Sequence, residues 1–129
     1  MGDELVFFFD SYALIEIFEG NPRFERYKDA KIYTSYLQLY ETYYCLIRNG
    51  YSEEEIRDFF NYLKKFCVNL DFKWIPMSVD FRRKYNKRDL SYADCLGYII
   101  ADDMKIKFLT GDKEFEDITN VEFVKKESK

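Results

Sequence analysis

The sequence predicts an α/β sandwich with a mostly parallel central sheet, built as a single domain from residues 1–129. Short apolar segments alternate with amphipathic helical segments along the whole chain, which is the pattern of a parallel sheet with helical crossovers. The first apolar segment, residues 5–9, is a continuous run, as expected for a central strand that is covered on both faces. Hydrophobic residues make up 47% of the chain, which is enough to build a core.

The strands and short helical segments are predicted from apolar runs and their boundaries. The strand at 5–9 ends at Asp10, and a helix follows over about 11–18. A short amphipathic segment around 22–28 precedes a strand at 32–34. The second half of the chain predicts a strand near 72–76, a basic helix near 79–87, strands at 107–110 and 121–124, and a helical turn at 113–117.

Three longer helices are predicted from capping boxes, in which a Ser precedes the helix and a Gln or an acidic residue follows three positions later. The pairs are Ser35 with Gln38, Ser52 with Glu55, and Ser91 with Asp94. The first of these helices should end near Asn49, because Gly50 is a common stop. Apolar side chains on one face of the other two helices are predicted to be buried: Ile56, Phe59, Phe60, Leu63, Phe66 and Cys67, and then Tyr92, Cys95, Leu96, Ile99 and Ile100.

Composition excludes several classes of protein. The chain has no histidine, which excludes Ser-His-Asp and Cys-His nucleophiles, imidazole acid–base pairs and histidine zinc sites. Cys45, Cys67 and Cys95 are widely spaced and lie in apolar patterns, so core thiols in a reducing cytosol are expected. The five glycines form neither a P-loop nor a dinucleotide motif. No signal peptide or membrane span is recognisable, so a cytoplasmic protein without membrane association is expected.

Four acidic residues are candidates for a shared site. Asp10 and Asp112 follow predicted strands, at the edge where α/β folds bind ligands, although each also suits an ordinary cap or turn. Glu41 lies within a helix and has no basic residue three or four positions away. Asp94 lies beside an apolar helical face, although position N3 of a capping box by itself suits an acid. If the four converge, they require a hard cation such as Mg²⁺ or Mn²⁺, because carboxylates alone repel one another.

A basic segment stands out in a chain whose net charge is −4, a charge that disfavours a plain nucleic-acid binder. Five of the seven residues 82–88 are Lys or Arg: Arg82, Arg83, Lys84, Lys87 and Arg88. This segment is either a phosphate-binding rim beside a metal site or a solvated helix face.

Aromatic residues crowd the central helices. Core packing is the default for such stripes, but their number exceeds what a chain of this size readily buries, so a dimer or partner surface is also predicted. The residues are Tyr36, Tyr40, Tyr43, Tyr44, Phe59, Phe60, Tyr62 and Phe66.

Taken together, these motifs resemble PIN-domain ribonucleases, and among them the VapC-type toxins. The resemblance rests on four features in order: an apolar strand ending in Asp10-Ser11, Glu41 in a helix after a strand, Ser91 to Asp94 opening a helix, and Leu109 to Phe115 after a strand. It covers nearly the whole chain, and the order, element type and spacing all fit.

The resemblance implies a three-layer α/β/α sandwich and Mg²⁺- or Mn²⁺-dependent endonucleolytic cleavage of RNA. It also implies a homodimer and, for the toxin types, an antitoxin protein that inserts a segment into the active-site groove. The site residues that it implies are Asp10, Glu41, Asp94 and Asp112 as the catalytic and metal-binding acids, Ser11 and Thr110 as hydroxyl supports, and Glu114 or Glu116 as a peripheral fifth acid.

The chain departs from the family pattern at one position. The family often has a small hydroxyl residue two positions after the first Asp, where this chain has Tyr12, so either Ser11 takes over that role or the supporting hydrogen bonds differ. Two other functions stay open, a housekeeping RNA-processing nuclease and a catalytically silent PIN-like binding module. A phosphatase or phosphoacceptor domain is disfavoured, because these have a second Asp at the Tyr12 position.

Overall fold

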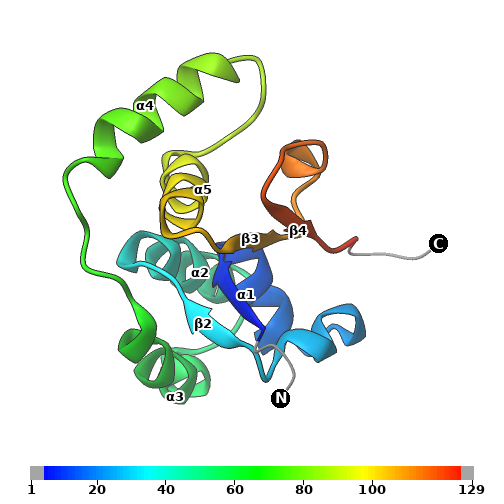
Figure 1. Cartoon of the computed structure of the whole chain (residues 1–129). Coiled ribbons are helices and arrows are strands. Elements are labelled where there is room, and N and C mark those ends of the chain that lie inside the picture. Colours follow the sequence, from blue (N-terminus) through cyan, green and yellow to red (C-terminus); the bar gives the residue numbers. More distant parts are fainter. Residues whose placement is uncertain (1–4, 126–129) are drawn as a thin grey trace.

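Four parallel strands form one sheet, in the order β2-β1-β3-β4, in the computed structural model, which describes residues 5–125. The strands are β1 (Val6–Phe9), β2 (Lys31–Tyr33), β3 (Lys107–Thr110) and β4 (Val121–Phe123). The central pair, β1 and β3, comes from opposite ends of the chain (Figure 1). Because they are parallel and adjacent, the residues that follow them meet at one edge of the sheet.

Side chains of β1 alternate between two hydrophobic cores, as the pleat of a strand requires. On one side Phe8 stacks on Phe108 of β3, with 6.1 Å between ring centroids, beneath α4 (Trp74–Lys84) and α5 (Tyr92–Met104). On the other side Phe7 and Phe9 pack with α1 (Ser11–Phe18), the 3-10 helix η1 (Pro22–Tyr27) and α3 (Glu53–Leu63). Helices therefore cover both faces, and the predicted three-layer α/β/α sandwich is confirmed.

The capping signals locate the longer helices. Ser52 and Ser91 each form a complete capping box, at the starts of α3 and α5. Ser35 caps α2 (Tyr36–Arg48), but Gln38 does not complete the box. Its amide nitrogen instead donates to the carbonyl of Ala93 in α5 at 2.6 Å, while the Ser35 hydroxyl donates to its oxygen. This contact fixes α2 against α5.

The prediction of a strand near 72–76 is wrong. Residues from Trp74 onward form α4, and Pro76 lies in its first turn, where no backbone N–H is needed for a helical hydrogen bond. Phe72 is 78% exposed, which a central strand would not allow. The outer neighbour of β2 is instead Cys67, which forms an isolated parallel bridge with Thr34 just after the 3-10 helix η2 (Lys64–Phe66).

The predicted burial is also wrong at several positions. Phe59, Phe60 and Phe66 are half-buried and pack against the core without lying inside it. Tyr92 is the first residue of α5 and lies at the open end of the helix, before the apolar face meets the core, so it is 74% exposed. Cys95 is buried as expected, whereas Cys45 and Cys67 are half-buried. Between residues 5 and 125 no helix combines the length and apolarity needed to cross a bilayer. The ends of the predicted single domain, 1–4 and 126–129, lie outside the described residues.

Gly97 permits the closest approach between α5 and its neighbours. A Cβ atom at this position would lie 2.7 Å from Gln38 Nε2, 2.9 Å from a Phe8 ring carbon and 3.1 Å from a Phe108 ring carbon. We therefore expect Gly97→Ala to lower the free energy of unfolding by about 1–3 kcal/mol, as for an overpacked core. An ordinary helical Gly→Ala change raises helix stability by about 1 kcal/mol, so the sign is diagnostic.

Urea denaturation of the two proteins measures this effect. Asp102→Ala, at an exposed position of the same helix, is the control and should change the unfolding midpoint little. A Gly97→Ala protein as stable as the parent would show that α5 can move away from β1 and β3.

Candidate active site

Asp10 and Asp112 follow the two central strands, and both also act as helix caps. Asp10 Oδ1 accepts a hydrogen bond from the Ala13 backbone N–H at 2.8 Å, at the start of α1. Asp112 Oδ1 accepts from the Glu114 N–H at 3.0 Å, at the start of the 3-10 helix η3 (Lys113–Phe115). Thr110 links the two acids, because its hydroxyl donates to Asp10 and accepts from the Asp112 N–H at 3.0 Å. The capping role and a site role are thus compatible in both residues.

Asp94 and Glu41 come from the two helices that pack at the same edge of the sheet. Asp94 Oδ2 accepts from the Ser91 backbone N–H at 2.9 Å, which completes the capping box of α5. Glu41 projects from α2, and its Oε1 accepts from the Ser11 hydroxyl at 3.0 Å. Ser11 therefore contacts Glu41, one of the four predicted acids, and its role as a hydroxyl support stays a prediction.

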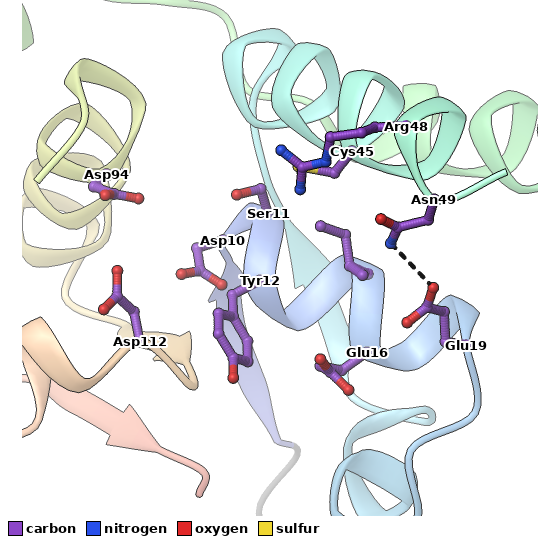
Figure 2. Close-up of a pocket in the computed structure, with 11 residues that line it drawn as sticks. Asp10, Ser11, Tyr12, Glu16, Glu19, Cys45, Arg48, Asn49, Asp94 and Asp112 are labelled. Carbon is purple, nitrogen blue, oxygen red and sulfur yellow. Dashed lines mark hydrogen bonds between the residues drawn. The ribbon is translucent and has the colours of Figure 1, made fainter. Parts of the chain in front are cut away.

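Three of the four acids line one cavity of about 370 Å³, here called the acidic cavity. The carboxylates of Asp10, Asp94 and Asp112 face one another across it, from three different elements of the chain (Figure 2). Glu41 lies at the margin, behind Ser11, and lines an adjoining cavity. Among residues 5–125 no three side chains of the metal-binding types already form a ligand cluster, so the acids share a cavity without a preformed metal centre.

Burial and mutual repulsion disfavour the ionised form of the carboxylates in this cavity. Burial raises the pKa of Asp10 well above its usual range, although hydrogen bonds from Thr110 and Ala13 oppose this, and the charges of Asp94 and Asp112 add to the increase. Burial raises the pKa of Asp94 to about 6; the hydrogen bond from the Ser91 N–H opposes this, and the charges of Glu41 and Asp112 add to the increase. A bound cation would offset both the repulsion and the lost hydration.

Tyr12, the departure from the family pattern, forms part of the cavity wall. Its ring packs so closely on Gly111 that a Cβ atom there would lie 2.5 Å from a ring carbon and 2.9 Å from the Val124 carbonyl oxygen. Gly111 thus accommodates Tyr12 immediately before Asp112. The bulky Tyr12 side chain fits after β1 because Gly111, at the end of the neighbouring strand β3, has no side chain.

Three charged residues of the cavity were not predicted from the sequence. The cavity is also lined by Glu16 of α1, by Glu19, the C-cap residue of α1, and by Arg48 of α2 (Figure 2). The available signal was helical spacing. Arg48 lies seven positions after Glu41, and Glu19 lies eight after Ser11, so each shares a helix face with a predicted site residue. Pairing these faces required knowing that α1 packs against α2, which is a tertiary contact.

The structure does not bring the other candidates into the acidic cavity. Glu114 and Glu116 do not line it. Arg88 is bound to Asp117 at 2.7 Å and donates to the Glu114 backbone carbonyl at 2.6 Å. Arg82 and Arg83 line a separate cavity beside Tyr92. Lys84 and Lys87 are exposed, and the Lys84 Nζ lies 5.4 Å from the ring of Tyr85.

The comparison with protein families identifies this arrangement. Residues 7–121 match the family model of the PIN domain, a range that contains all four predicted acids. The chain belongs to the PIN-domain family. PIN domains are typically nucleases and generally use divalent metal ions, in agreement with a cavity lined by carboxylates. The predicted family is therefore confirmed.

A solved structure supports the same PIN-domain architecture. A chain of a toxin–antitoxin complex from Klebsiella pneumoniae superposes with a TM-score of 0.72, at 20% sequence identity, over 90% of this chain and 95% of that chain. At this identity the likeness shows a shared fold. A search of the curated protein sequences finds no match to this chain.

The donor set of this PIN domain fits a hard divalent cation. All the candidate ligands are carboxylate oxygens, which Mg²⁺ and Mn²⁺ prefer, and the cavity contains no histidine because the chain has none. Burial, with a smaller contribution from the neighbouring carboxylates, raises the pKa of Asp10 and of Asp94, and a bound cation would act against both causes.

Proposed function

We propose that this PIN-domain protein is a divalent-metal-dependent endoribonuclease and the toxin of a toxin–antitoxin pair. The observation that carries the nuclease proposal is the acidic cavity, where Asp10, Asp94 and Asp112 meet from two strand ends and a helix start. Each of these carboxylates caps a helix, but capping does not require the three to face one another, and their mutual repulsion raises the energy of the cavity unless a cation binds. The same residues suit an Mg²⁺ or Mn²⁺ ion that binds phosphate oxygens.

In this proposal Asp10, Asp94 and Asp112 hold the metal and Glu41 supports the reaction from the margin. A bound divalent ion would supply positive charge and lower the pKa of a water molecule. Ser11 occupies Glu41 Oε1, which leaves Oε2 as the oxygen that can accept a proton from the attacking water. Thr110 keeps Asp10 and Asp112 in register with each other through its two hydrogen bonds.

Arg48 is the positive charge that the chain itself places in the acidic cavity. Its Nη2 contacts Cys45 Sγ at 3.6 Å, and no carboxylate of residues 5–125 lies within ion-pair distance of it. A guanidinium without a carboxylate partner, beside a metal site, suits a phosphate oxygen. We assign Arg48 to hold the scissile phosphate and to stabilise its developing charge.

The toxin role is proposed from the known structure with the same fold, which is that of a toxin–antitoxin complex. An antitoxin that inserts a segment into the groove would inhibit by covering the acidic cavity. Tyr36 and Tyr43 of α2, which line a separate apolar cavity, suit the predicted homodimer. A housekeeping nuclease would have the same chemistry and differ in its partner.

Cleavage of a mixed single-stranded RNA tests the proposed activity. The intact protein should cleave it internally with Mn²⁺ or Mg²⁺ and stop when EDTA is added, since the carboxylates alone cannot stabilise a phosphorane. Restoration by excess Mn²⁺ separates metal removal from protein damage. A folded protein that leaves every RNA intact and gives no heat signal on titration with Mn²⁺ would instead be a catalytically silent binding module.

A further inference from the structure

A second cavity, of about 420 Å³, adjoins the acidic cavity and is walled by tyrosines; we call it the tyrosine cavity. Its wall includes Tyr40, Tyr44, Tyr92 and the acid Glu41. The three rings are 72%, 61% and 74% exposed, far more than core aromatics. None of these rings fills the core, and a cluster of exposed aromatic side chains indicates a surface that binds a ligand or partner.

Two hydrogen bonds join the tyrosine cavity to the acidic cavity. Ser11 of the acidic cavity donates to Glu41 of the tyrosine cavity at 3.0 Å. Asp94 of the acidic cavity accepts from the Ser91 N–H at 2.9 Å, and Ser91 also lines the tyrosine cavity. The two spaces thus share a wall, and a chain that reaches the acids from this side must pass the tyrosines.

Two tyrosines of the tyrosine cavity each have an arginine side chain over the ring. The Arg82 guanidinium carbon lies 4.6 Å from the centroid of Tyr92, and that of Arg48 lies 5.7 Å from the centroid of Tyr44. Between residues 5 and 125 neither arginine has a carboxylate within ion-pair distance. The arginine covers one face of each ring. The other face and the edge are therefore the exposed part of the ring, which a ligand can contact.

Tyr92 also stands between the tyrosine cavity and a third one, which contains Arg82 and Arg83. The surface therefore alternates from basic to aromatic to acidic: Arg82 and Arg83 come first, Tyr92 follows, and Glu41 is last. Arg82 Nε donates to the Leu90 carbonyl at 3.2 Å, which leaves its terminal nitrogens for a ligand. Flat rings combined with guanidinium groups that have no carboxylate partner suit single-stranded nucleic acid, because rings stack on bases while cations contact phosphates. A groove for an apolar protein segment would not need the two arginines.

We propose that Tyr92 and Tyr44 stack on unpaired bases of a single-stranded RNA and so deliver the strand to the acidic cavity. This inference rests on the proposed nuclease function and names the side chains that would hold the bases of its single-stranded substrate. The phosphates near Tyr92 contact Arg82, and those near Tyr44 contact Arg48. Duplex RNA is a poor ligand, because its bases are already stacked.

Binding in EDTA, where no cleavage occurs, tests the inference. Fluorescence anisotropy would compare a labelled single-stranded oligouridine with an abasic ribose-phosphate strand of the same length. Tyr92→Ala and Tyr44→Ala should each weaken oligouridine binding by about 5- to 100-fold and leave the abasic strand unaffected, because only the former has bases to stack. Tyr92→Phe keeps the ring and should bind like the parent.

Tyr62→Ala is the matched control. Tyr62 is an exposed tyrosine of α3 with Lys65 Nζ 5.9 Å from its ring centroid, and it lines neither the acidic nor the tyrosine cavity. Its removal should leave RNA affinity unchanged. Equal loss for the base-containing and abasic strands, or for Tyr62→Ala and Tyr92→Ala, would overturn base stacking.

Cleavage by the parent separates this inference from the proposed function. If the parent cleaves RNA and both tyrosine variants keep the parental affinity, only the stacking inference is overturned. If the parent binds oligouridine through these tyrosines but never cleaves RNA, the stacking inference is supported and the proposed nuclease activity is overturned. Tyrosine variants that become monomeric in sedimentation while binding RNA normally would assign the rings to a contact with a second copy, against the inference.

Discussion

Asp94→Asn should reduce metal-dependent RNA cleavage by roughly 100-fold or more while leaving the fold intact. The amide oxygen of Asn can still accept the Ser91 N–H that completes the capping box, so the start of α5 keeps its hydrogen bond. What is lost is one of the three aspartate carboxylates that face one another across the acidic cavity. Initial rates on single-stranded RNA at saturating Mn²⁺ measure the effect.

Asp102→Asn is the isosteric control for this experiment. It makes the same chemical change in the same helix, at an exposed position outside the acidic cavity. Its rate should equal that of the parent, and both variants should give the parental circular dichroism spectrum. An Asp94→Asn protein that cleaves at the parental rate would remove Asp94 from the metal-binding set and with it the proposed arrangement.

Without metal, the same substitution should stabilise the protein above neutral pH. In the folded state the pKa of Asp94 is raised from 3.8 to about 6, so the folded state holds its proton over a range where the unfolded state has lost it. Stability from this group is therefore greatest at low pH and is lost as the pH rises through about 6. Asn cannot ionise, and its advantage over Asp should grow by about 1–2 kcal/mol between pH 5 and pH 8.

Urea unfolding in EDTA at the two pH values measures this difference, and addition of Mn²⁺ provides the reverse test. At pH 8 the ionised carboxylates bind the ion, so Mn²⁺ at about 100 times its Kd should raise the stability of the parent by about 2.7 kcal/mol. The Asn variant should gain much less, so Mn²⁺ should remove most of its stability advantage over the parent. If the stability difference between the two proteins did not change with pH, ionised Asp94 would not destabilise the folded state and its pKa would not be raised.

The fold was predictable from local signals wherever those signals are chemically specific. Ser52 and Ser91 start α3 and α5 because their hydroxyls satisfy backbone N–H groups that the helix cannot. The apolar run before Asp10 forms β1 because only a strand covered on both faces tolerates it. The strand at 107–110 has its predicted bounds.

The errors in the predicted fold arise where local sequence carries two meanings. Phe72 to Pro76 is apolar and contains a proline, which suits a strand boundary and the first turn of a helix equally well. Tyr92 fits the apolar spacing of α5, but it is the first residue of the helix and lies beyond the part of the sheet that α5 covers, so it is exposed. Neither ambiguity is resolved without the neighbouring elements.

The candidate site divides in the same way. Asp10 and Asp112 could be placed together because parallel strands end at one edge, and the sequence order gave no reason to separate them. Arg48, Glu16 and Glu19 could not be placed, because their positions depend on which faces of α1 and α2 meet. The basic segment 82–88 was identified as a unit, but its side chains diverge, with Arg88 bound to Asp117 and Arg82 stacked on Tyr92.

The pairing of β1 with β3 has a consequence for the newly made chain. Phe9 lies beside Leu109, so the two halves of the acidic cavity are about a hundred residues apart in the order of synthesis. While the C-terminal third is still inside the ribosome, Asp10 and Glu41 have no Asp94 or Asp112 to meet. A nascent chain that still lacks Asp94 and Asp112 therefore has two of the four acids proposed for the active site and cannot yet form the acidic cavity.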